Sequence, residues 1–328
     1  MDVKSGEIIF VKCVKDGIPN RDPLADSDAR RIFDDGRISL SDVSMKRDVR
    51  DYVLARYPDG GEQKRNFIFV REERTPEGNL LGRGNLVNAI LERAGVDKDR
   101  DLKTSVDRKQ ALCKHTFDVR VFGAVYSVKN ESFHLTGPVQ FGWAHSLHPV
   151  ETRYVQGTVV MPSKEAGVKK KGEADEEGSA EEGKAQGTIW TTYTLPFAVF
   201  VMPGVINGVI ASQTEMREAD VDLLLEGLWR GTQHRQARGR GNQQPLFLLH
   251  VEYKDPFFRI GYLEEGVCLG ENVPKSLNEV RLDLRLLGQT LERHRDKIAR
   301  CRYWTNPALA GTQGQESLLG EAGRLFGE

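Results

Sequence analysis

The sequence predicts an α+β fold with a discontinuous βαββαβ core. The prediction depends on strand-like runs rich in β-branched and aromatic residues, on helix-like stretches with apolar residues three or four apart, and on the order in which they alternate. In chain order, the six core elements are residues 7–14, 41–57, 117–130, 132–144, 212–231 and 245–253. This order is typical of ferredoxin-like and RRM-like domains.

The first and last core strands are the clearest. EIIFVKCV (7–14) and PLFLLHVEY (245–253) are dense in residues that favour strands. The run after the first strand, DGIPNRDPLAD, is rich in turn formers, so the strand ends near residue 16. FDVRVFGAVYSVKN (117–130) and SFHLTGPVQFGWA (132–144) are predicted to form the central hairpin, with its turn near Asn130.

Two helices complete the core. The stretch 41–57 has Ser41 at the N-cap position. In SQTEMREADVDLLLEGLWRG (212–231), Ser212 and Glu215 have the spacing of a capping box, and Gly231 ends the helix. Its apolar residues repeat at helical spacing, and they are Val221, Leu224, Leu225, Leu228 and Trp229.

The other segments are predicted to be insertions into the core or extensions of it, so the core itself comprises residues 1–20 and 116–260. Residues 21–115 are a largely helical insertion that includes the helix 41–57. Residues 151–195 form a protruding hairpin, whose tip at about 162–187 has almost no large apolar side chain and is predicted to be disordered. Residues 261–328 form a C-terminal helical tail.

Composition excludes several classes of protein. With 39% hydrophobic and 29% charged residues, a mean hydropathy of -0.48 and no apolar run of roughly 18 residues, the sequence predicts no membrane association. Its N-terminal residues do not resemble a signal peptide, so a cytoplasmic protein is expected. The four cysteines are isolated in the sequence, which predicts no metal and no cofactor. Because the net charge is only -1, any binding to nucleic acid must depend on local clusters.

Basic residues cluster in two places. On the helix 41–57, a projection at 100° per residue places Lys46, Arg47 and Arg50 in one sector and the acidic residues 48 and 51 in another, where they relieve the repulsion poorly. The loop HRQARGRG combines glycines with three arginines that can approach phosphates closely, Arg235, Arg238 and Arg240. A solvated helix face and a mobile surface loop are the alternative interpretations.

The stretch LTGPVQFGWAHSLHP (135–149) raises the question of catalysis. His145, Ser146 and His148 lie close together in the sequence, but no metal-binding or nucleophile motif accompanies them. The sequence therefore predicts no catalytic residue here. Its aromatic and polar residues are instead expected to form a binding surface, with alternate residues facing the ligand.

Five stretches, in matching order, resemble the CRISPR-associated backbone subunit of type I Cascade complexes, of the kind found in subtypes I-B and I-C. They are PNRDPLAD (19–26), DVSMKRDVRDYV (42–53), FDVRVFGAV (117–125), TGPVQF with SLHPV (136–150), and the D-x-DLLLEGLW helix with its ARGRG loop (220–241).

This resemblance implies an RRM-like palm, a fingers region at about 21–115 and a thumb hairpin at about 151–195. Copies of such subunits form a helical filament along the CRISPR guide RNA, beside other Cascade subunits, and the guide pairs with a strand of target DNA. The implied RNA-binding residues are Asn20, Arg21, Lys46, Arg47, Arg50, Gln140, Phe141, Trp143, His145, Ser146, Arg235, Arg238 and Arg240. Met161, Ile189 and Trp190 are candidates to wedge beside a flipped nucleotide, although packing within the hairpin explains them equally well.

Two further functions remain open on the sequence alone. Related backbone subunits of type III effectors cut target RNA with an aspartate in the first loop, which makes Asp22 or Asp26 the candidate of a Mg-dependent endoribonuclease. A generic single-stranded RNA-binding module is the other. The resemblance favours a non-catalytic scaffold for guide RNA.

Overall fold

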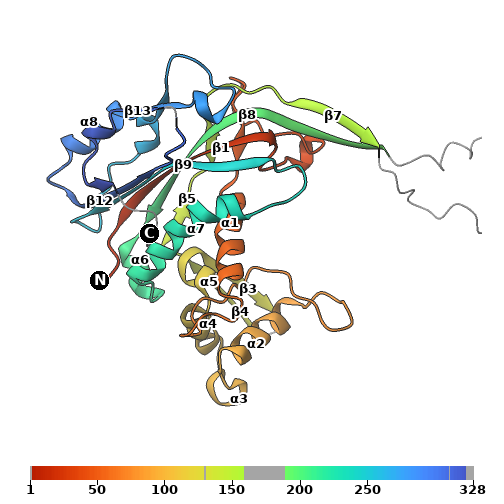
Figure 1. The fold of residues 1–328 in the computed structure, drawn as a ribbon. Coiled ribbons are helices and arrows are strands. Elements are labelled where there is room, and N and C mark those ends of the chain that lie inside the picture. Colours follow the sequence, from red (N-terminus) through yellow and green to blue (C-terminus); the bar gives the residue numbers. More distant parts are fainter. Residues whose placement is uncertain (1, 129–130, 159–188, 310, 323–328) are drawn as a thin grey trace, which may run out of the picture.

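A largely antiparallel sheet forms the centre of the larger part of the molecule (Figure 1). The computed structural model describes residues 2–128, 131–158, 189–309 and 311–322. Within them the strand order is β14-β12-β9-β1-β8-β6-β2, and β5 and β7 also pair with β8. The strands are β1 (Gly6–Gly17), β2 (Ser39–Leu40), β5 (Val139–Phe141), β6 (Ala144–Ser146), β7 (Arg153–Thr158), β8 (Ile189–Ile206), β9 (Asn242–Tyr253), β12 (Ile298–Thr305) and β14 (Glu321–Ala322).

Strand β1 is buried on both faces. Because successive side chains of a strand point to opposite faces, Ile8 and Phe10 pack into one core, whereas Ile9 and Val11 pack into another. This explains why β1 is a continuous apolar run without the alternation of a half-exposed strand.

Helices α1 (Asp42–Arg56) and α7 (Glu218–His234) cover one face of the sheet. Met45 and Val49 of α1 share a core with Leu228 of α7. The helices approach closely at Gly231, where an added Cβ would lie 2.5 Å from the backbone oxygen of Asp48. The assignment of helix 41–57 to an insertion is therefore wrong, because the apolar side of α1 belongs to the main core.

The predicted start of the second helix is also wrong. Ser212 lies in a separate short helix, α6 (Gly208–Gln213), and Glu215 has a φ of 59°. Helix α7 starts after Arg217, whose backbone N–H donates to the carboxylate of Asp220. A capping interaction is present, but it lies several residues later than predicted.

The predicted central hairpin is wrong in its strands. Residues Phe117–Phe122 form helix α5, and the following strands β3 (Gly123–Val128) and β4 (Glu131–Thr136) pair with each other, apart from the central sheet. The strand predicted at 132–144 is broken, because β5 and β6 follow β4 as separate short strands that pair with β8. In chain order β1, α1, β6, β8, α7 and β9 follow one another, with the four strands arranged as β9-β1-β8-β6. The α+β class with an antiparallel sheet is confirmed.

A second, smaller lobe lies below the sheet in Figure 1. It comprises the β3–β4 ribbon and helices α2 (Arg83–Arg93), α3 (Lys98–Asp101) and α4 (Ser105–His115). Its own core includes Phe67, Ile90, Leu112 and Tyr126. Helix α5 joins the lobe to the sheet, since Val119 packs into the core of the lobe whereas Val121 packs into the main core.

The C-terminal part covers the other face of the sheet. It contains one α-helix among its described residues, α8 (Arg285–Arg293), with strand β12 and the small sheet β10 (Cys268–Leu269), β11 (Arg281–Asp283) and β13 (Gly311–Gln313). The predicted helical tail is therefore wrong. Arg300 and Arg302 of β12 form ion pairs with Glu252 and Asp222 on neighbouring elements.

A two-stranded ribbon projects from the sheet (Figure 1). Strand β7 pairs with residues 189–194 of β8, and the rest of the 18-residue β8 continues into the central sheet beside β1. The predicted tip at about 162–187 and Met161 lie outside the described residues. Within the described part of the chain, no helix has the length and apolar character needed to cross a bilayer.

Candidate nucleic-acid interface

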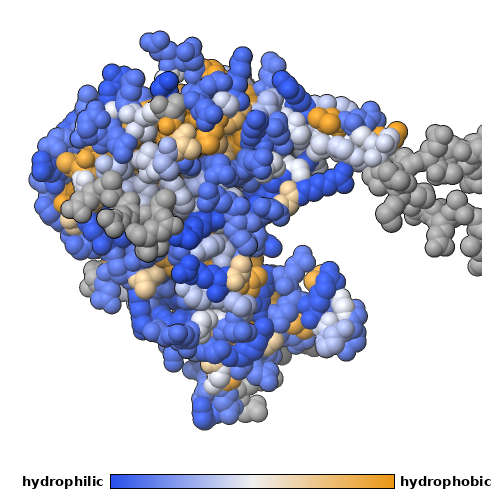
Figure 2. All heavy atoms as spheres, viewed as in Figure 1, coloured by the Kyte–Doolittle hydropathy of each residue, from blue (hydrophilic) through white to orange (hydrophobic). Residues whose placement is uncertain are grey.

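The surface is hollowed between the projecting ribbon and the smaller lobe, and the walls of this recess are mostly hydrophilic (Figure 2). Helix α1 lies at its inner end, and the loop that joins α7 to β9 borders it. The segments that the sequence analysis singled out, the loop after β1, the helix α1 and the loop 235–241, meet here.

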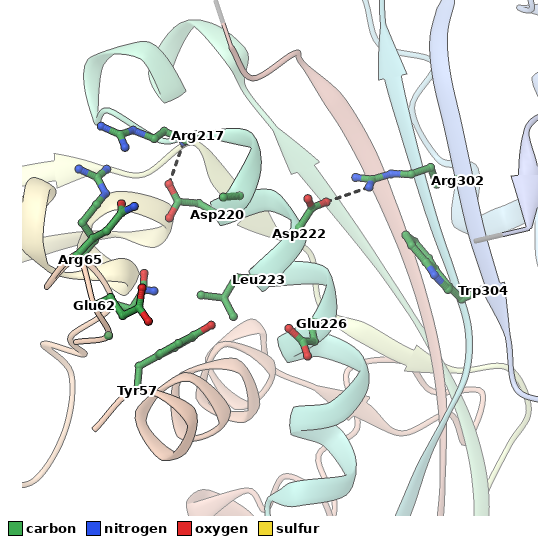
Figure 3. A pocket seen from close by; sticks show the side chains of 14 residues that line it. Tyr57, Glu62, Arg65, Arg217, Asp220, Asp222, Leu223, Glu226, Arg302 and Trp304 are labelled. Atoms are coloured by element: carbon green, nitrogen blue, oxygen red, sulfur yellow. Dashed lines mark hydrogen bonds and ion pairs between the residues drawn. The ribbon is translucent and has the colours of Figure 1, made fainter. Parts of the chain in front are cut away.

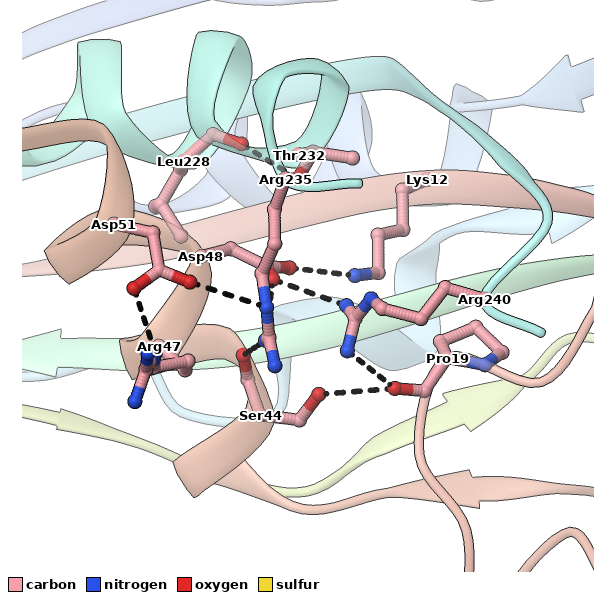
Figure 4. Close-up of polar contacts among 10 residues, drawn as sticks. All are labelled: Lys12, Pro19, Ser44, Arg47, Asp48, Asp51, Leu228, Thr232, Arg235 and Arg240. Carbon is pink, nitrogen blue, oxygen red and sulfur yellow. Dashed lines mark hydrogen bonds and ion pairs between the residues drawn. The ribbon is translucent and has the colours of Figure 1, made fainter. Parts of the chain in front are cut away.

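Strand β1, helix α1 and the loop 235–241 meet at the carboxylate of Asp48 (Figure 4). Its Oδ1 accepts hydrogen bonds from Arg235 Nη1 at 2.9 Å and from Arg240 Nη2 at 3.0 Å, and its Oδ2 accepts from Lys12 Nζ at 3.1 Å. Asp48 is fully buried. Burial lowers the pKa of the Lys12 ammonium, and the attraction of Asp48 opposes this shift.

The arginine loop packs against the loop after β1. Arg240 Nη1 donates to the carbonyl oxygen of Pro19 at 2.8 Å, and the backbone N–H of Ile18 donates to the carbonyl of Gly239 at 2.7 Å. Gly239 has a φ of 78°, which a glycine adopts without strain. The glycines thus permit close contact between two loops of the protein, and Arg240 is buried in that contact.

Each of the three cations predicted on α1 to bind RNA has a carboxylate partner. Lys46 pairs with Asp42 at 2.9 Å, Arg47 with Asp51 at 2.6 Å, and Arg50 with the buried Asp118 at 3.0 Å. The inference that acidic residues relieve this cluster poorly is therefore wrong. Asp51 was assigned to another sector although it lies four residues after Arg47, and the projection left out Asp42 and the distant Asp118. The side chain of Arg47 is 44% exposed, whereas Arg50 is buried.

The stretch 135–149 divides into buried and accessible side chains. Phe141 is buried against Phe122, and Ser146 accepts from the N–H of Ile38 and donates to the carbonyl of His148. These two side chains lie inside the protein. Of the RNA-binding residues predicted in this stretch, three remain partly exposed, Gln140, Trp143 and His145.

The accessible three each have a neighbour. Gln140 accepts from Lys46 Nζ at 3.4 Å, and the guanidinium of Arg30 lies 5.2 Å from the ring centroid of Trp143. His145 Nδ1 lies 2.9 Å from Ser39 Oγ, and burial lowers the pKa of its ring. No catalytic pair exists between Ser146 and His148, because Ser146 contacts the backbone of His148 and not its imidazole.

The remaining candidates lie on the ribbon or contact it. Arg21 Nη2 donates to Thr192 Oγ1 at 2.7 Å, and the guanidinium of Arg238 lies 4.8 Å from the ring centroid of Trp190. Ile189 is 60% exposed. By contrast, Asn20 Oδ1 accepts from the backbone N–H of Ser41, so this side chain fixes the start of α1.

The sequence analysis missed several residues of this surface. Lys12 is a cation between the buried Val11 and Cys13 of β1, and that position was a usable signal of a buried ion pair. Arg30 beside Trp143 and Arg37 over the ring of Phe33, 4.6 Å away, add cations to the segment 21–40. Leu24 of the same segment is 98% exposed.

The aspartates proposed for metal-dependent cleavage are not arranged for it. Asp22 accepts from the backbone N–H of Leu24 and pairs with Arg30, and the N–H bond holds the pKa of this carboxyl below its usual range. Among the residues with described positions, no group of three or more His, Cys, Asp or Glu side chains is placed to bind a metal ion.

A separate cavity of about 760 Å³ lies between α7, the loop 57–66 and β12 (Figure 3). Tyr57, Leu223 and Trp304 supply its apolar walls. Three of its carboxylates have partners inside the protein, since Asp220 binds Arg120, Asp222 binds Arg302 and Glu226 binds Arg56.

Chains from solved assemblies have a similar overall fold. One, from a "CRISPR RNA-guided surveillance complex, pre-nicking", aligns with a TM-score of 0.52 at 16% identity and covers 94% of this chain and 95% of that chain. A second, from a "CRISPR RNA-guided surveillance complex", aligns with a TM-score of 0.51 at 15% identity and covers 95% of each. At these identities the likeness concerns the fold.

The sequence comparisons give the family. The family described as "CRISPR-associated protein Cas7" matches residues 4–285, and the chain belongs to this family. The CRISPR-associated protein Cas7 of Haloferax volcanii is 29% identical over 315 residues, which are 89% of this chain and 84% of that protein.

Proposed function

We propose that this chain is a non-catalytic, guide-RNA-binding backbone subunit of a CRISPR surveillance complex of the type I Cascade kind. Several copies assemble along the guide RNA, beside other subunits, and present the guide for pairing with target DNA. In this proposal the central sheet with α1 and α7 is a ferredoxin-like palm, the β7–β8 ribbon is the thumb, and the smaller lobe forms the fingers.

The observation that carries the proposal is the convergence of basic side chains at the hydrophilic recess. Arg21 and Arg238 contact the ribbon, and Arg47 and the partly exposed Arg235 lie on α1 and the loop beside it. Such local clusters bind phosphates without a high net charge. Gln140, Trp143 and His145 lie on the same stretch and complete the proposed surface.

The buried candidates take a supporting role in this proposal. Phe141 and Ser146 pack inside the sheet, Arg50 holds Asp118, Arg240 holds Asp48, and Asn20 fixes the start of α1. Ile189 and Trp190, at the outer end of β8, remain the described candidates for contact with a flipped nucleotide.

The test compares two double charge reversals. Arg47→Glu with Arg238→Glu alters the recess, whereas Arg285→Glu with Arg295→Glu alters exposed arginines at the start of α8 and just after its end, on the other face of the sheet. Each protein is co-expressed with a CRISPR array, and the retained RNA is quantified and sequenced at increasing salt. The recess variant is expected to retain less RNA, and the slope of log K against log salt should fall by about one for each lost phosphate contact.

Equal RNA content in the two variants would remove these arginines from the interface. A wild-type protein that remains an RNA-free monomer in native mass spectra, even beside its guide, would contradict the proposed function. We also expect no cleavage of a complementary RNA in Mg²⁺. Cleavage lost in Asp22→Ala or Asp26→Ala would instead favour the endoribonuclease, and binding without multimers would favour a generic RNA-binding module.

A further inference from the structure

The carboxylate of Asp48 connects three parts of the recess wall. It receives Lys12 from β1, Arg235 from the residue that follows α7, and Arg240 from the far end of the loop 235–241 (Figure 4). Both ends of the loop 235–241 thus bind the buried carboxylate of Asp48 on α1. The accessible Arg238 lies between those two ends.

Positive charge is in excess around this carboxylate. Asp51 also pairs with Arg235, at 3.3 Å, but it is shared with Arg47. Lys12, Arg47, Arg235 and Arg240 therefore face two carboxylates, those of Asp48 and Asp51. Burial lowers the pKa of Lys12 and of Arg240, as expected for cations that are poorly compensated and shielded from water.

The loop 235–241 connects the Asp48 carboxylate to Arg238 and Arg21. Arg240 also holds the carbonyl of Pro19, and the preceding residue, Gly239, lies against the guanidinium of Arg21. Arg238 stacks on Trp190 of the ribbon. The position of Arg238 relative to Arg21 therefore depends on a loop whose two ends are held by Asp48.

We propose that Asp48 is a positioning residue for guide-RNA binding. It does not touch the RNA, and it acts by holding the loop 235–241 so that Arg238 and Arg21 face the recess. This inference rests on the proposed function. A negative charge beside a polyanion site would weaken binding through the electrostatic field alone, so orientation and field predict opposite effects of its removal.

The deciding variant is Asp48→Asn, which keeps the size of the side chain and removes its charge. Binding of a fluorescent single-stranded guide RNA to the full chain is measured by anisotropy at several salt concentrations. A field effect would make the variant bind more tightly. We expect binding roughly tenfold weaker or more, the range for one lost charged hydrogen bond, and a salt slope smaller by about one. Asp222→Asn, which removes an exposed carboxylate of α7 far from the loop, is the charge-matched control.

Two further variants distinguish a specific loss of RNA binding from a loss of folding. Lys12→Met added to Asp48→Asn removes the ammonium that would otherwise be buried without a carboxylate, so the melting temperature should recover while RNA binding stays weak. Arg238→Gln should weaken RNA binding more in the wild-type protein than in the Asp48→Asn variant, because Arg238 is already misplaced in that variant.

The outcomes distinguish a failure of the positioning role of Asp48 from a failure of the proposed function. If the wild type binds guide RNA and Asp48→Asn binds it equally or more tightly, Asp48 has no positioning role and the proposed function stands. Independent, multiplicative effects of Asp48→Asn and Arg238→Gln would also overturn the role. If the wild type binds no guide RNA, the proposed function fails and this role fails with it.

Discussion

Replacing Arg120 with Met is expected to destabilise the protein more than any exposed substitution. Arg120 is fully buried in α5, and its guanidinium forms a bidentate pair with Asp220 of α7, with Nη2–Oδ1 at 2.6 Å and Nε–Oδ2 at 3.0 Å. Its Nη1 also donates to the carbonyls of Cys113 and Thr116, at 2.9 and 3.2 Å. The pair joins the smaller lobe to the helix layer of the sheet.

The size of the effect follows from what Met leaves behind. Removing one partner of a buried pair costs about 3–5 kcal/mol, because the other charge stays buried without compensation. For large domains, each kcal/mol lowers the melting temperature by roughly 2–4 °C, so a decrease of about 6–20 °C is expected. Asp220→Leu in the same chain removes the orphaned carboxylate and should restore much of this loss, less about 1 kcal/mol for the lost helix cap at Arg217.

Thermal melts of RNA-free wild type, single variants and the double variant, followed by circular dichroism, measure the coupling. Recovery in the double variant identifies the buried charge as the cause. The reasoning is refuted if Arg120→Met shifts the melting temperature by less than about 2 °C, or if the double variant is at least as unstable as the sum of the single variants.

Three further predictions concern other parts of the chain. His250 is buried beside Arg302 and Arg300, and its burial lowers its pKa to about 3. In the unfolded chain the same histidine binds a proton near pH 6.5. The free energy of unfolding therefore falls by up to roughly 1.4 kcal/mol per pH unit as the pH drops from 6.5 towards 3. Melting curves of His250→Gln should show a shallower loss over that range, and parallel curves would contradict the assignment. Gly231→Ala should destabilise by about 1–3 kcal/mol, since its Cβ would overlap the backbone of Asp48, whereas Gly82→Ala, with open space around it, should be close to neutral in urea unfolding. In the folded protein, iodoacetamide should modify Cys268 alone among the four cysteines, because Cys268 is exposed and the other three thiols are buried. Burial raises the pKa of Cys13 and Cys301 to about 12 and that of Cys113 to about 11. More than one adduct by mass spectrometry would show that the buried thiols are accessible.

Local sequence signals predicted the elements whose burial pattern is simple. Strands β1 and β9 and helix α1 lie where the apolar runs and periodicity place them. The errors arose where local composition and tertiary context disagree. FDVRVF is rich in strand formers, yet it is helical because Asp118 and Arg120 are held by α1 and α7. In β12, alternating arginines that suggested a charged helix are strand residues neutralised by neighbouring carboxylates.

The candidate site was predicted by segment more successfully than by residue. The loop after β1, helix α1 and the arginine loop do meet at one recess. Which of their side chains stay accessible depends on partners far away in the sequence. Arg50 finds Asp118, 68 residues on, and Arg240 finds Asp48, 192 residues back. A helical projection of one segment contains no information on either contact.

The length of β8 has a mechanical consequence. Its 18 residues extend over about 60 Å at the usual rise per residue, and the same strand pairs with β7 in the ribbon and with β1 in the sheet. Because one continuous strand runs through both parts, the inner end of the ribbon is fixed in the middle of the domain. A load on its outer end bends the ladder that places Phe200 opposite Lys12. A neighbouring molecule that presses on the ribbon therefore deforms β1, the strand that carries the buried Lys12. The stiffness of the sheet limits how far the ribbon can move.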